Sequence, residues 1–387
     1  MIKGKKLLAL GAAAALTLAA CGDDDDSDDT SADTEAMDDG ESAEGGDAFV
    51  TLDAECETYG GVEAPEGFTV NLVTDIGKID DGTFNQFAYE GMNGAVDCFG
   101  IENSSYIETV SEADYAANIA TSLEDDPNVV VTVGFLITTD TEEAATANPD
   151  VDFIGVDQFL PEYPENMAGI QFNEDESGWI AGVLAASLSE SGVVGVVAGR
   201  EDVPPVVKFV NGYTAGAQSV NPDIRVLSIY NESFTDLAKG ASDANQFIGE
   251  GADVIFGAGG QTGSGGVKAA AEQGVWGIGV DQDEYYTTFN GGEAPGSEYL
   301  ASSAIKRVDL AVFRLIADAV QDQFEGGLVV GTAANNLITY APAHDADLPA
   351  EVTDAVETAR EGLADGSITT NICGQDGLFI GEGSACD

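Results

Sequence analysis

Residues 74–91, TDIGKIDDGTFNQFAYEG, bring carboxylates, side-chain amides and an aromatic ring together in one short stretch. Carboxylates and amides hydrogen-bond the polar edges of a ligand, and an aromatic ring stacks on a flat one. These residue types therefore favour binding of a flat, polar small molecule. The residues concerned are Asp75, Asp80, Asp81, Phe84, Asn85 and Gln86.

The elements around this segment predict how its side chains are positioned. The apolar run 68–73 predicts a strand, and apolar residues at helical spacing predict a helix over 84–99. The loop between a strand and the next helix is where open α/β sheets bind ligands. Thr83 and Gln86 have the spacing of a capping box, which predicts Thr83 as the N-cap. Phe84 then lies in the first turn, where it either faces a ligand or packs as a core aromatic.

Strand-like and helical segments alternate along the rest of the chain, which predicts parallel sheets built from βαβ units. The strand segments are apolar on successive residues, as expected when helices cover both faces of a sheet. The pattern runs twice, so we expect an α/β fold of two lobes with a cleft between them. The expected strands are 69–74, 105–109, 129–134, 153–156, 193–197, 225–229, 254–257 and 276–280. The expected helices are 84–99, 113–123, 137–147, 176–188, 206–220, 235–248, 265–273, 303–323 and 350–364.

The length of the chain also favours two lobes, since a body of this size exceeds one ordinary core. We expect lobe one at 66–172 plus about 300–327, with the helix 303–323 returning to it. Lobe two is then expected at 173–299 plus about 328–387.

The N-terminus has the features of an export signal. A lysine-containing start precedes a short Ala- and Leu-rich run, which is too short for a stable membrane span. The run ends Leu-Ala-Ala-Cys, which resembles a bacterial lipobox and predicts a signal peptide at 1–20 and lipidation of Cys21. The alternative is an ordinary signal peptide followed by an incidental cysteine. The acidic segment after Cys21 predicts a disordered linker over 21–65 that tethers the body to the outer face of the cell membrane.

The 387-residue chain carries a formal net charge of −57. Nucleic acid and anionic lipid are poor partners for such a surface. Charge spread over the whole chain suits solubility in high salt, where screening weakens self-repulsion. We therefore hypothesise a saline habitat, which a gain in stability between low and molar salt would support.

The remaining four cysteines predict two disulfides, because an even number in an exported protein is typical of paired thiols. Three pairings are possible. We favour Cys56–Cys98, which would pin the start of the body to the end of the first helix, and Cys373–Cys386, which would close the C-terminal tail. The spacings do not cluster and the chain has one histidine, so we expect no metal site.

Eight blocks of sequence occur in the order found in one known family. They are TDIGKIDDGTFNQ (74–86), PDVDFIGVDQ (149–158), NEDESGWIAGVLAA (173–186), FVNGYTAG (209–216), ESFTDLAKG (232–240), GADVIFGAGGQTGSGG (251–266), IGVDQDE (278–284) and SSAIKRVD (302–309). Together they resemble the basic membrane protein family of substrate-binding lipoproteins, which includes the PnrA-like purine nucleoside receptors. The resemblance covers about residues 68–340.

The resemblance implies a type I periplasmic-binding fold, with two Rossmann-like lobes, a three-strand hinge and the ligand in the cleft. It implies a receptor that hands a nucleoside to an ABC permease and its ATPase, with a membrane contact through the lipid alone and no cofactor. The pocket residues that it implies are Asp75, Phe84, Asn85, Phe234, Gly259, Gly260, Asp281 and Lys306.

The same resemblance implies separate roles within that pocket. Phe84 and Phe234 would stack on the two faces of the base, which Asp75 would hydrogen-bond. Asp281 and Lys306 would hold the ribose hydroxyls, although a strand-end cap and a solvated helix charge are their ordinary alternatives. Asp80 and Asp81 become loop-shaping and capping charges.

One block departs from the family pattern, and this leaves the nucleoside open. The family usually reads AGGTG where this chain reads AGGQTG, and the extra residue, Gln261, falls where backbone would meet the ligand.

Other function classes stay open to different degrees. An enzyme is not expected, because the chain lacks a P-loop ending and a GxSxG motif. The alternatives within binding are a sugar receptor for transport and a ligand-sensing lipoprotein that feeds no permease.

Overall fold

The computed structural model describes residues 50–387. The expected signal peptide, Cys21 and most of the expected linker lie outside the described residues. No helix in the described part of the chain is long and apolar enough to cross a membrane.

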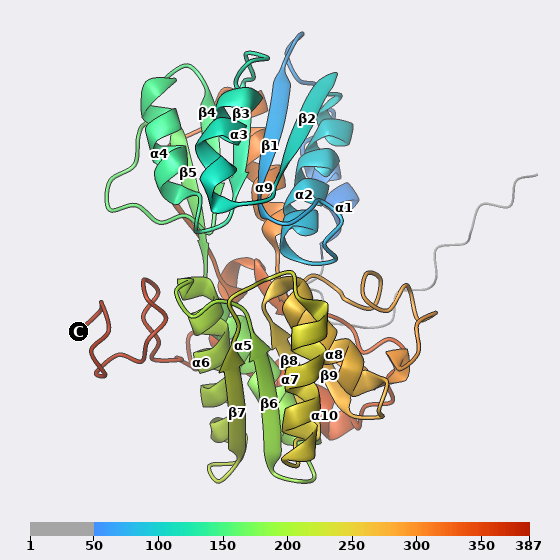
Figure 1. Cartoon of the computed structure of the whole chain (residues 1–387). Helices are drawn as coiled ribbons and strands as arrows, with labels where there is room; N and C mark the ends of the chain where they lie inside the picture. The colour runs from blue at the N-terminus through green and yellow to red at the C-terminus, as the bar shows by residue number, and fades with distance from the viewer. Residues whose placement is uncertain (1–49) are drawn as a thin grey trace, which may run out of the picture. The chain divides into compact units, whose positions relative to one another are not determined.

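Lobe one is built on a six-stranded sheet with the order β11-β5-β4-β3-β1-β2, and all of its strands run parallel (Figure 1). Its strands are β1 (Thr69–Ile76), β2 (Asn103–Thr109), β3 (Val129–Val133), β4 (Asp152–Val156), β5 (Met167–Phe172) and β11 (Gly327–Gly331). Its helices are α1 (Leu52–Thr58), α2 (Phe84–Phe99), η1 (Glu112–Asp114), α3 (Tyr115–Ser122), α4 (Thr138–Ala147) and α9 (Val308–Val320).

Successive side chains of β3 show why these strands are apolar throughout. Val129 and Val131 pack with the helices α2 and α9, whereas Val130 packs with α3 and α4 on the opposite face. Because strand side chains alternate between faces, a strand covered on both sides has no polar face. The continuous apolar runs in the sequence therefore predict the layers correctly.

Lobe two repeats this plan with a second six-stranded sheet, ordered β12-β10-β9-β8-β6-β7. Only the short β12 runs antiparallel to its neighbour. Its strands are β6 (Val193–Ala198), β7 (Arg225–Tyr230), β8 (Val254–Ala258), β9 (Trp276–Asp281), β10 (Leu300–Lys306) and β12 (Ile338–Tyr340). Its helices are α5 (Glu174–Leu188), α6 (Pro204–Val220), α7 (Leu237–Gly249), α8 (Gly260–Ala271), η2 (Ser297–Tyr299), η3 (Ala333–Asn335) and α10 (Ala350–Ala364).

The chain passes between the lobes three times, between β5 and α5, between β10 and α9, and between β11 and β12. Backbone hydrogen bonds tie the crossings together: Asn173 N donates to Gly331 O at 2.8 Å, and Arg307 N donates to Leu337 O at 2.9 Å. A hinge of three segments lies between two lobes whose sheets have the same strand order and differ in the direction of one edge strand.

The return to lobe one begins later than the sequence predicts. Residues 300–306 form β10, a fully buried strand of lobe two, and the helix starts only at Val308. The expected helix 303–323 is therefore wrong over its first residues. The strand has the sequence LASSAIK, whose small and polar residues do not form the apolar run typical of a buried strand. It is nevertheless fully buried, because it pairs with β9 inside the sheet. The end of the return is also later, because β11 (Gly327–Gly331) belongs to lobe one.

The expected linker is wrong at its C-terminal end, where α1 forms. Thr51 caps this helix by accepting a hydrogen bond from Ala54 N. Arg314 of α9 binds both carboxylate oxygens of Glu55, at 2.6 and 3.0 Å. The disulfide Cys56–Cys98 joins α1 to α2. These contacts give the segment an ordered place in lobe one.

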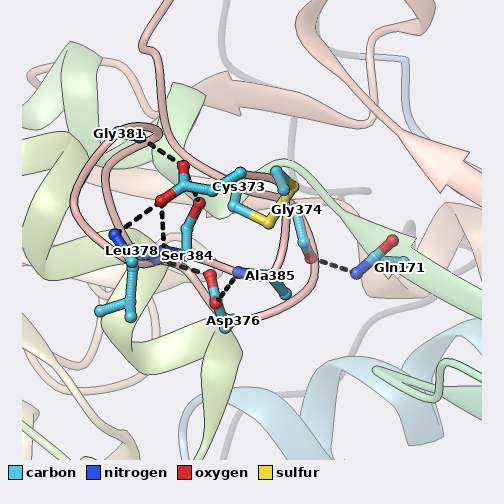
Figure 2. The surroundings of a disulfide bond; sticks show 11 residues. Gln171, Cys373, Gly374, Asp376, Leu378, Gly381, Ser384 and Ala385 are labelled. Carbon is cyan, nitrogen blue, oxygen red and sulfur yellow. Dashed lines mark hydrogen bonds between the residues drawn. A yellow bond between two sulfur atoms is a disulfide. The ribbon is translucent and has the colours of Figure 1, made fainter.

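The second disulfide, Cys373–Cys386, closes the C-terminal tail as favoured from the sequence (Figure 2). The tail also contacts both lobes. Gly374 O accepts a hydrogen bond from the Gln171 side chain of β5, and Gly377 O accepts one from Asn211 Nδ2 of α6 at 2.7 Å. The tail is thus fixed beside the hinge.

Candidate functional site

A pocket lies where the carboxyl ends of the two sheets face each other, and it holds about 650 Å³ of non-atom space, including the part open to solvent. All eight pocket residues predicted from the sequence line it, from both lobes. The remaining lining residues are Ile76, Asp81, Phe135, Asp157, Val203, Pro205, Val206, Phe209, Thr235, Ala258, Gln261 and Val280.

The loop after β1 is shaped by Asp81 rather than by Thr83. The Thr83 side chain makes no capping hydrogen bond, so the predicted capping box is wrong. Instead, the Asp81 carboxylate accepts hydrogen bonds from the backbone N–H groups of Thr83, Asn85 and Gln86, at 2.9, 3.1 and 3.1 Å. An anion at a helix N-terminus satisfies several unpaired N–H groups at once. Asp81 is therefore the capping charge expected from the sequence.

Asn85 is buried and ties this loop to the end of β1. Its Oδ1 accepts a hydrogen bond from Asp75 N at 2.9 Å, and its Nδ2 donates to Asp81 Oδ2 at 3.0 Å. The amide thereby fixes the backbone of Asp75, while Phe84, its neighbour in the first turn of α2, lines the pocket.

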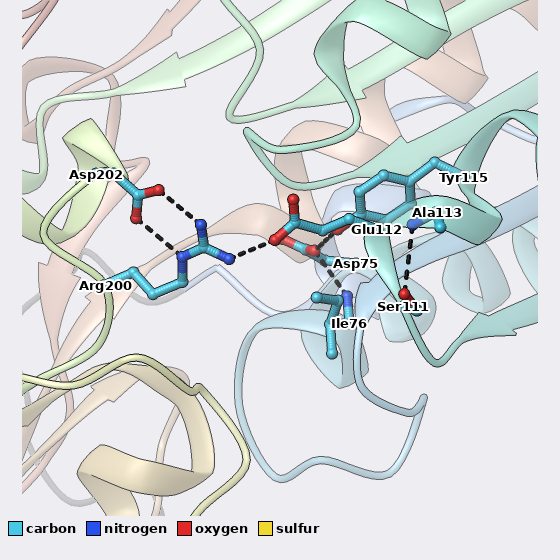
Figure 3. Close-up of polar contacts among 8 residues, drawn as sticks. All are labelled: Asp75, Ile76, Ser111, Glu112, Ala113, Tyr115, Arg200 and Asp202. Carbon is cyan, nitrogen blue, oxygen red and sulfur yellow. Dashed lines mark hydrogen bonds and ion pairs between the residues drawn. The ribbon is translucent and has the colours of Figure 1, made fainter.

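Asp75 presents a buried carboxylate to the pocket (Figure 3). Its Oδ1 accepts hydrogen bonds from Ile76 N at 2.7 Å and from the Tyr115 hydroxyl of α3. Burial raises the pKa of this carboxyl to about 6, and the two hydrogen bonds oppose the shift. The carboxyl is held in one orientation, ready to accept a hydrogen bond from a ligand.

Lys306 ends β10 and is the cation of the pocket, not a helix residue as the sequence predicts. Its Nζ lies 2.6 Å from Asp157 Oδ2 and 2.9 Å from Glu174 Oε1. Glu174 also pairs with Lys208, which donates to Phe172 O at 2.6 Å. Burial by itself lowers the pKa of Lys306, but the surrounding carboxylates raise it above its ordinary value. The lysine therefore stays charged inside the protein.

Lys306 also lies over aromatic rings. Its Nζ is 4.8 Å from the centroid of Phe84 and 5.2 Å from that of Phe172. These distances suit cation–π attraction, which strengthens away from water. Lys306 thus contacts both the ring of Phe84 in lobe one and the carboxylates of Asp157 and Glu174 at the hinge.

Asp157 and Asp281 occupy equivalent positions in the two lobes. Each is the fourth residue of an IGVDQ pentapeptide, at 154–158 across the end of β4 and at 278–282 across the end of β9. Their φ values are 60° and 66°, a left-handed conformation that residues other than glycine rarely adopt. Such strain is concentrated at functional sites.

The electrostatic states of these two aspartates differ from those of exposed carboxyls. Burial raises the pKa of Asp157 to about 6 and that of Asp281 to about 7, and Lys306 opposes both shifts. In the described residues, Asp157 Oδ1 is buried without a hydrogen-bond partner. An oxygen of this kind is costly unless a ligand donates to it. Sequence reasoning missed Asp157, although the repeated pentapeptide pointed to it.

Phe234 approaches the pocket from lobe two, in the loop between β7 and α7. Glycines make room for its ring: a Cβ on Gly199 would overlap the ring, and Gly260 has a φ of 56° directly beside Phe234. Gly260 opens α8, which starts earlier than the predicted helix at 265–273. The Gly-rich turn therefore brings backbone and Phe234 together on one wall.

Direct contacts between the lobes hold the pocket closed. Gln282 Nε2 donates to Thr83 O at 3.0 Å, and Thr287 Oγ1 donates to Gly82 O at 2.8 Å. Figure 3 shows Arg200 of lobe two between Asp202 and Glu112, with Glu112 in lobe one. The closed arrangement thus depends on residues from both lobes.

Comparisons with known proteins agree with this architecture. A family model described as ABC transporter substrate-binding protein PnrA-like matches residues 68–335. The ABC transporter nucleoside-binding protein BmpA of Lactococcus lactis subsp. cremoris is 33% identical over 317 residues, which span 77% of this chain and 87% of that protein. An uncharacterized lipoprotein of Pyrococcus furiosus is 33% identical over 281 residues, which span 68% of this chain and 67% of that one.

A solved structure gives the same result for the fold. The crystal structure of an ABC transporter solute-binding protein from Aeropyrum pernix K1 matches with a TM-score of 0.66 and 25% identity, over 78% of this chain and 92% of that chain. The α/β fold of two lobes with parallel sheets, expected from the sequence, is therefore confirmed as that of periplasmic solute-binding proteins.

Proposed function

The chain belongs to the PnrA-like family of ABC transporter substrate-binding proteins, and on that premise we propose that it captures a nucleoside, of purine type, and delivers it to an ABC permease. The family consists of binding proteins rather than enzymes. Nucleoside binding is the function named for the relative from Lactococcus lactis.

The observation that carries the proposal is the arrangement of rings and carboxylates along the pocket. Phe84 from lobe one and Phe234 from lobe two line it together with the carboxylates of Asp75, Asp157 and Asp281. Asp75 lies next to the last residue of β1 and Asp157 directly follows β4, and these strands are two positions apart in the sheet. Since neighbouring strands lie about 4.8 Å apart, the carboxylates are roughly 10 Å apart. A base joined to a ribose can span such a distance.

The two ends suit the two parts of a nucleoside. Stacking a base on an aromatic ring contributes on the order of 1–3 kcal/mol. Asp75 can accept a hydrogen bond from an N–H group of the base. At the hinge end, Asp157 and Asp281 can accept from ribose hydroxyls, and charge-assisted bonds of this kind are stronger than neutral ones. Lys306 balances these carboxylates once water leaves the closed pocket.

Titration calorimetry tests the ligand. The purified protein is titrated with guanosine, inosine, adenosine, uridine and cytidine, and with ribose and the free bases. We expect submicromolar binding of a purine nucleoside and much weaker heat with ribose or base alone. Heat with ribose but with no nucleoside would overturn the ligand and favour the sugar receptor.

We also propose that the protein is held at the outer face of the cell membrane by a lipid on Cys21. Its support is the lipobox-like sequence and the lipoprotein among its relatives. Cys21→Ser should move the protein from the membrane fraction to the soluble fraction after cell lysis, whereas an exchange of Ser27 for Ala should not. Membrane association of the Cys21→Ser variant would contradict the proposed anchor.

A further inference from the structure

A second hollow, a groove, lies beside the pocket at one of its ends. This groove holds about 980 Å³ of non-atom space, part of it open to solvent. Ile76, Thr235 and Gln261 line both the pocket and the groove, so the two spaces share a wall. The residues that line only the groove are Gly77, Lys78, Asp80, Glu108, Thr109 and Val110.

Strand order shows which end of the pocket adjoins the groove. Gly77 directly follows β1, and Thr109 is the last residue of β2. These are the two outermost strands on one side of the lobe-one sheet. Asp157 directly follows β4 and Lys306 ends β10, and both strands lie toward the hinge. The groove therefore adjoins the Asp75 end, where the proposed function places the base.

The hinge end of the pocket is filled by buried charged side chains. The side chains of Lys306, Glu174 and Lys208 are only 2%, 0% and 1% exposed. They form a chain of ion pairs behind the proposed ribose site, so an added group on the ribose would have to displace buried charges. Breaking a buried pair is strongly destabilising.

Gln261 stands on the shared wall with an available amide. It lies in the first turn of α8, and its side chain makes no hydrogen bond within residues 50–387. An amide offers two N–H donors and one oxygen acceptor. It can bind a polar group that leaves the pocket in the direction of the groove.

The groove has its own charge preference. Lys78 is its cation, and Asp80 and Glu108 are its carboxylates. The carboxylates are in excess, on a protein whose net charge is −57. Val110, 85% exposed, adds an apolar contact. This combination favours a neutral or cationic group over an anionic one.

We propose that the cleft takes nucleosides whose base carries an additional substituent, and that the substituent lies in the groove beside Gln261 and Val110. This inference rests on the proposed function, because it uses the orientation of the base toward Asp75. The ligand class is thus base-modified nucleosides with a neutral or cationic substituent, in addition to the unmodified ones.

The test uses the full-length protein and three adenosine analogues that carry the same 6-aminohexyl arm, on N6, on C2 or on the 5′ position. By calorimetry, the N6 or the C2 analogue should bind within about fivefold of adenosine, and the 5′ analogue at least 100-fold more weakly. Replacing the terminal amine of the tolerated arm by a carboxylate should weaken binding at least threefold at low salt.

A groove variant supplies an internal control. Val110→Trp fills the groove without touching the pocket, so it should weaken the arm-bearing ligand at least fivefold and leave adenosine unchanged. Val220→Trp, at another exposed valine, should change neither. If adenosine binds but both base-modified analogues bind at least 100-fold more weakly, the inference is wrong and the proposed function stands. If no nucleoside binds, the proposed function fails together with the inference.

Discussion

Asp281 offers a sharp test of the electrostatics of the pocket, because its charge opposes folding. It is buried among Asp157, Asp81 and Glu174, with Lys306 as the compensating cation. We expect Asp281→Asn to stabilise the ligand-free protein at pH 8 and to weaken nucleoside binding at least tenfold. A residue that destabilises the fold while it serves the ligand would show a stability–function trade-off.

The size of the effect follows from the pKa of Asp281, which burial raises from 3.8 to about 7. A group with a raised pKa gives its full stability below pH 3.8, and that stability is lost as the pH rises through about 7. Each unit corresponds to about 1.4 kcal/mol. The two pH units between pH 5 and the folded-state pKa of about 7 therefore predict that the unfolding free energy of the wild type falls by about 3 kcal/mol. The Asn variant lacks the titrating group and avoids this fall.

Urea unfolding of both proteins at pH 5 and pH 8 measures this loss. The stability gained by Asp281→Asn over the wild type should be larger at pH 8 by about 3 kcal/mol. Asp80→Asn, which removes an exposed carboxyl in the loop after β1, is the matched control for the loss of one negative charge. Equal pH dependence of Asp281→Asn and wild type would refute the view that Asp281 is buried with incomplete compensation.

Three further changes test the stacking, the closure and the first disulfide. Phe84→Ala should weaken nucleoside binding at least tenfold, about 1.4 kcal/mol, with an unchanged circular dichroism spectrum; unaltered affinity in calorimetry would contradict stacking. Arg200→Ala removes a cross-lobe ion pair to Glu112 in which the side chains are 23% and 50% exposed, so it should weaken binding by no more than about fivefold and less so in high salt. If the affinity of the variant depends on salt as that of the wild type does, this ion pair does not stabilise the closed pocket. Replacing Cys56 and Cys98 by Ser opens a loop of sequence separation 42 and should lower the unfolding free energy by about 2–4 kcal/mol in urea titrations; an unchanged midpoint would show that the disulfide adds no stability.

The sequence predicts those parts of the fold whose residues follow one simple pattern. Apolar runs located β1, β3, β4, β6, β8 and β9 but not β5 (Met167–Phe172), and the helix over 84–99 matches α2. In contrast, β10 reads LASSAIK, and its burial comes from pairing with β9 in a sheet that forms only at long range. Tertiary context overrides local propensity at such positions.

The candidate site was predictable residue by residue where the resemblance reached, and less so elsewhere. All eight predicted residues line one pocket. Asp157 was not predicted, although IGVDQ occurs at both 154–158 and 278–282, because the importance of the repeat depends on the equivalence of β4 and β9 in the two folded lobes. The capping box failed since Asp81 offers a charged oxygen to three N–H groups, whereas Thr83 can offer only a hydroxyl.

A crystal structure of the protein grown with a purine nucleoside is the measurement that tests the proposed ligand site most directly. We expect density for the base between the rings of Phe84 and Phe234, with its polar edge at Asp75 and the ribose hydroxyls at Asp157 and Asp281. Density for the nucleoside outside the interlobe pocket, or with the ribose at Asp75, would contradict the proposed site.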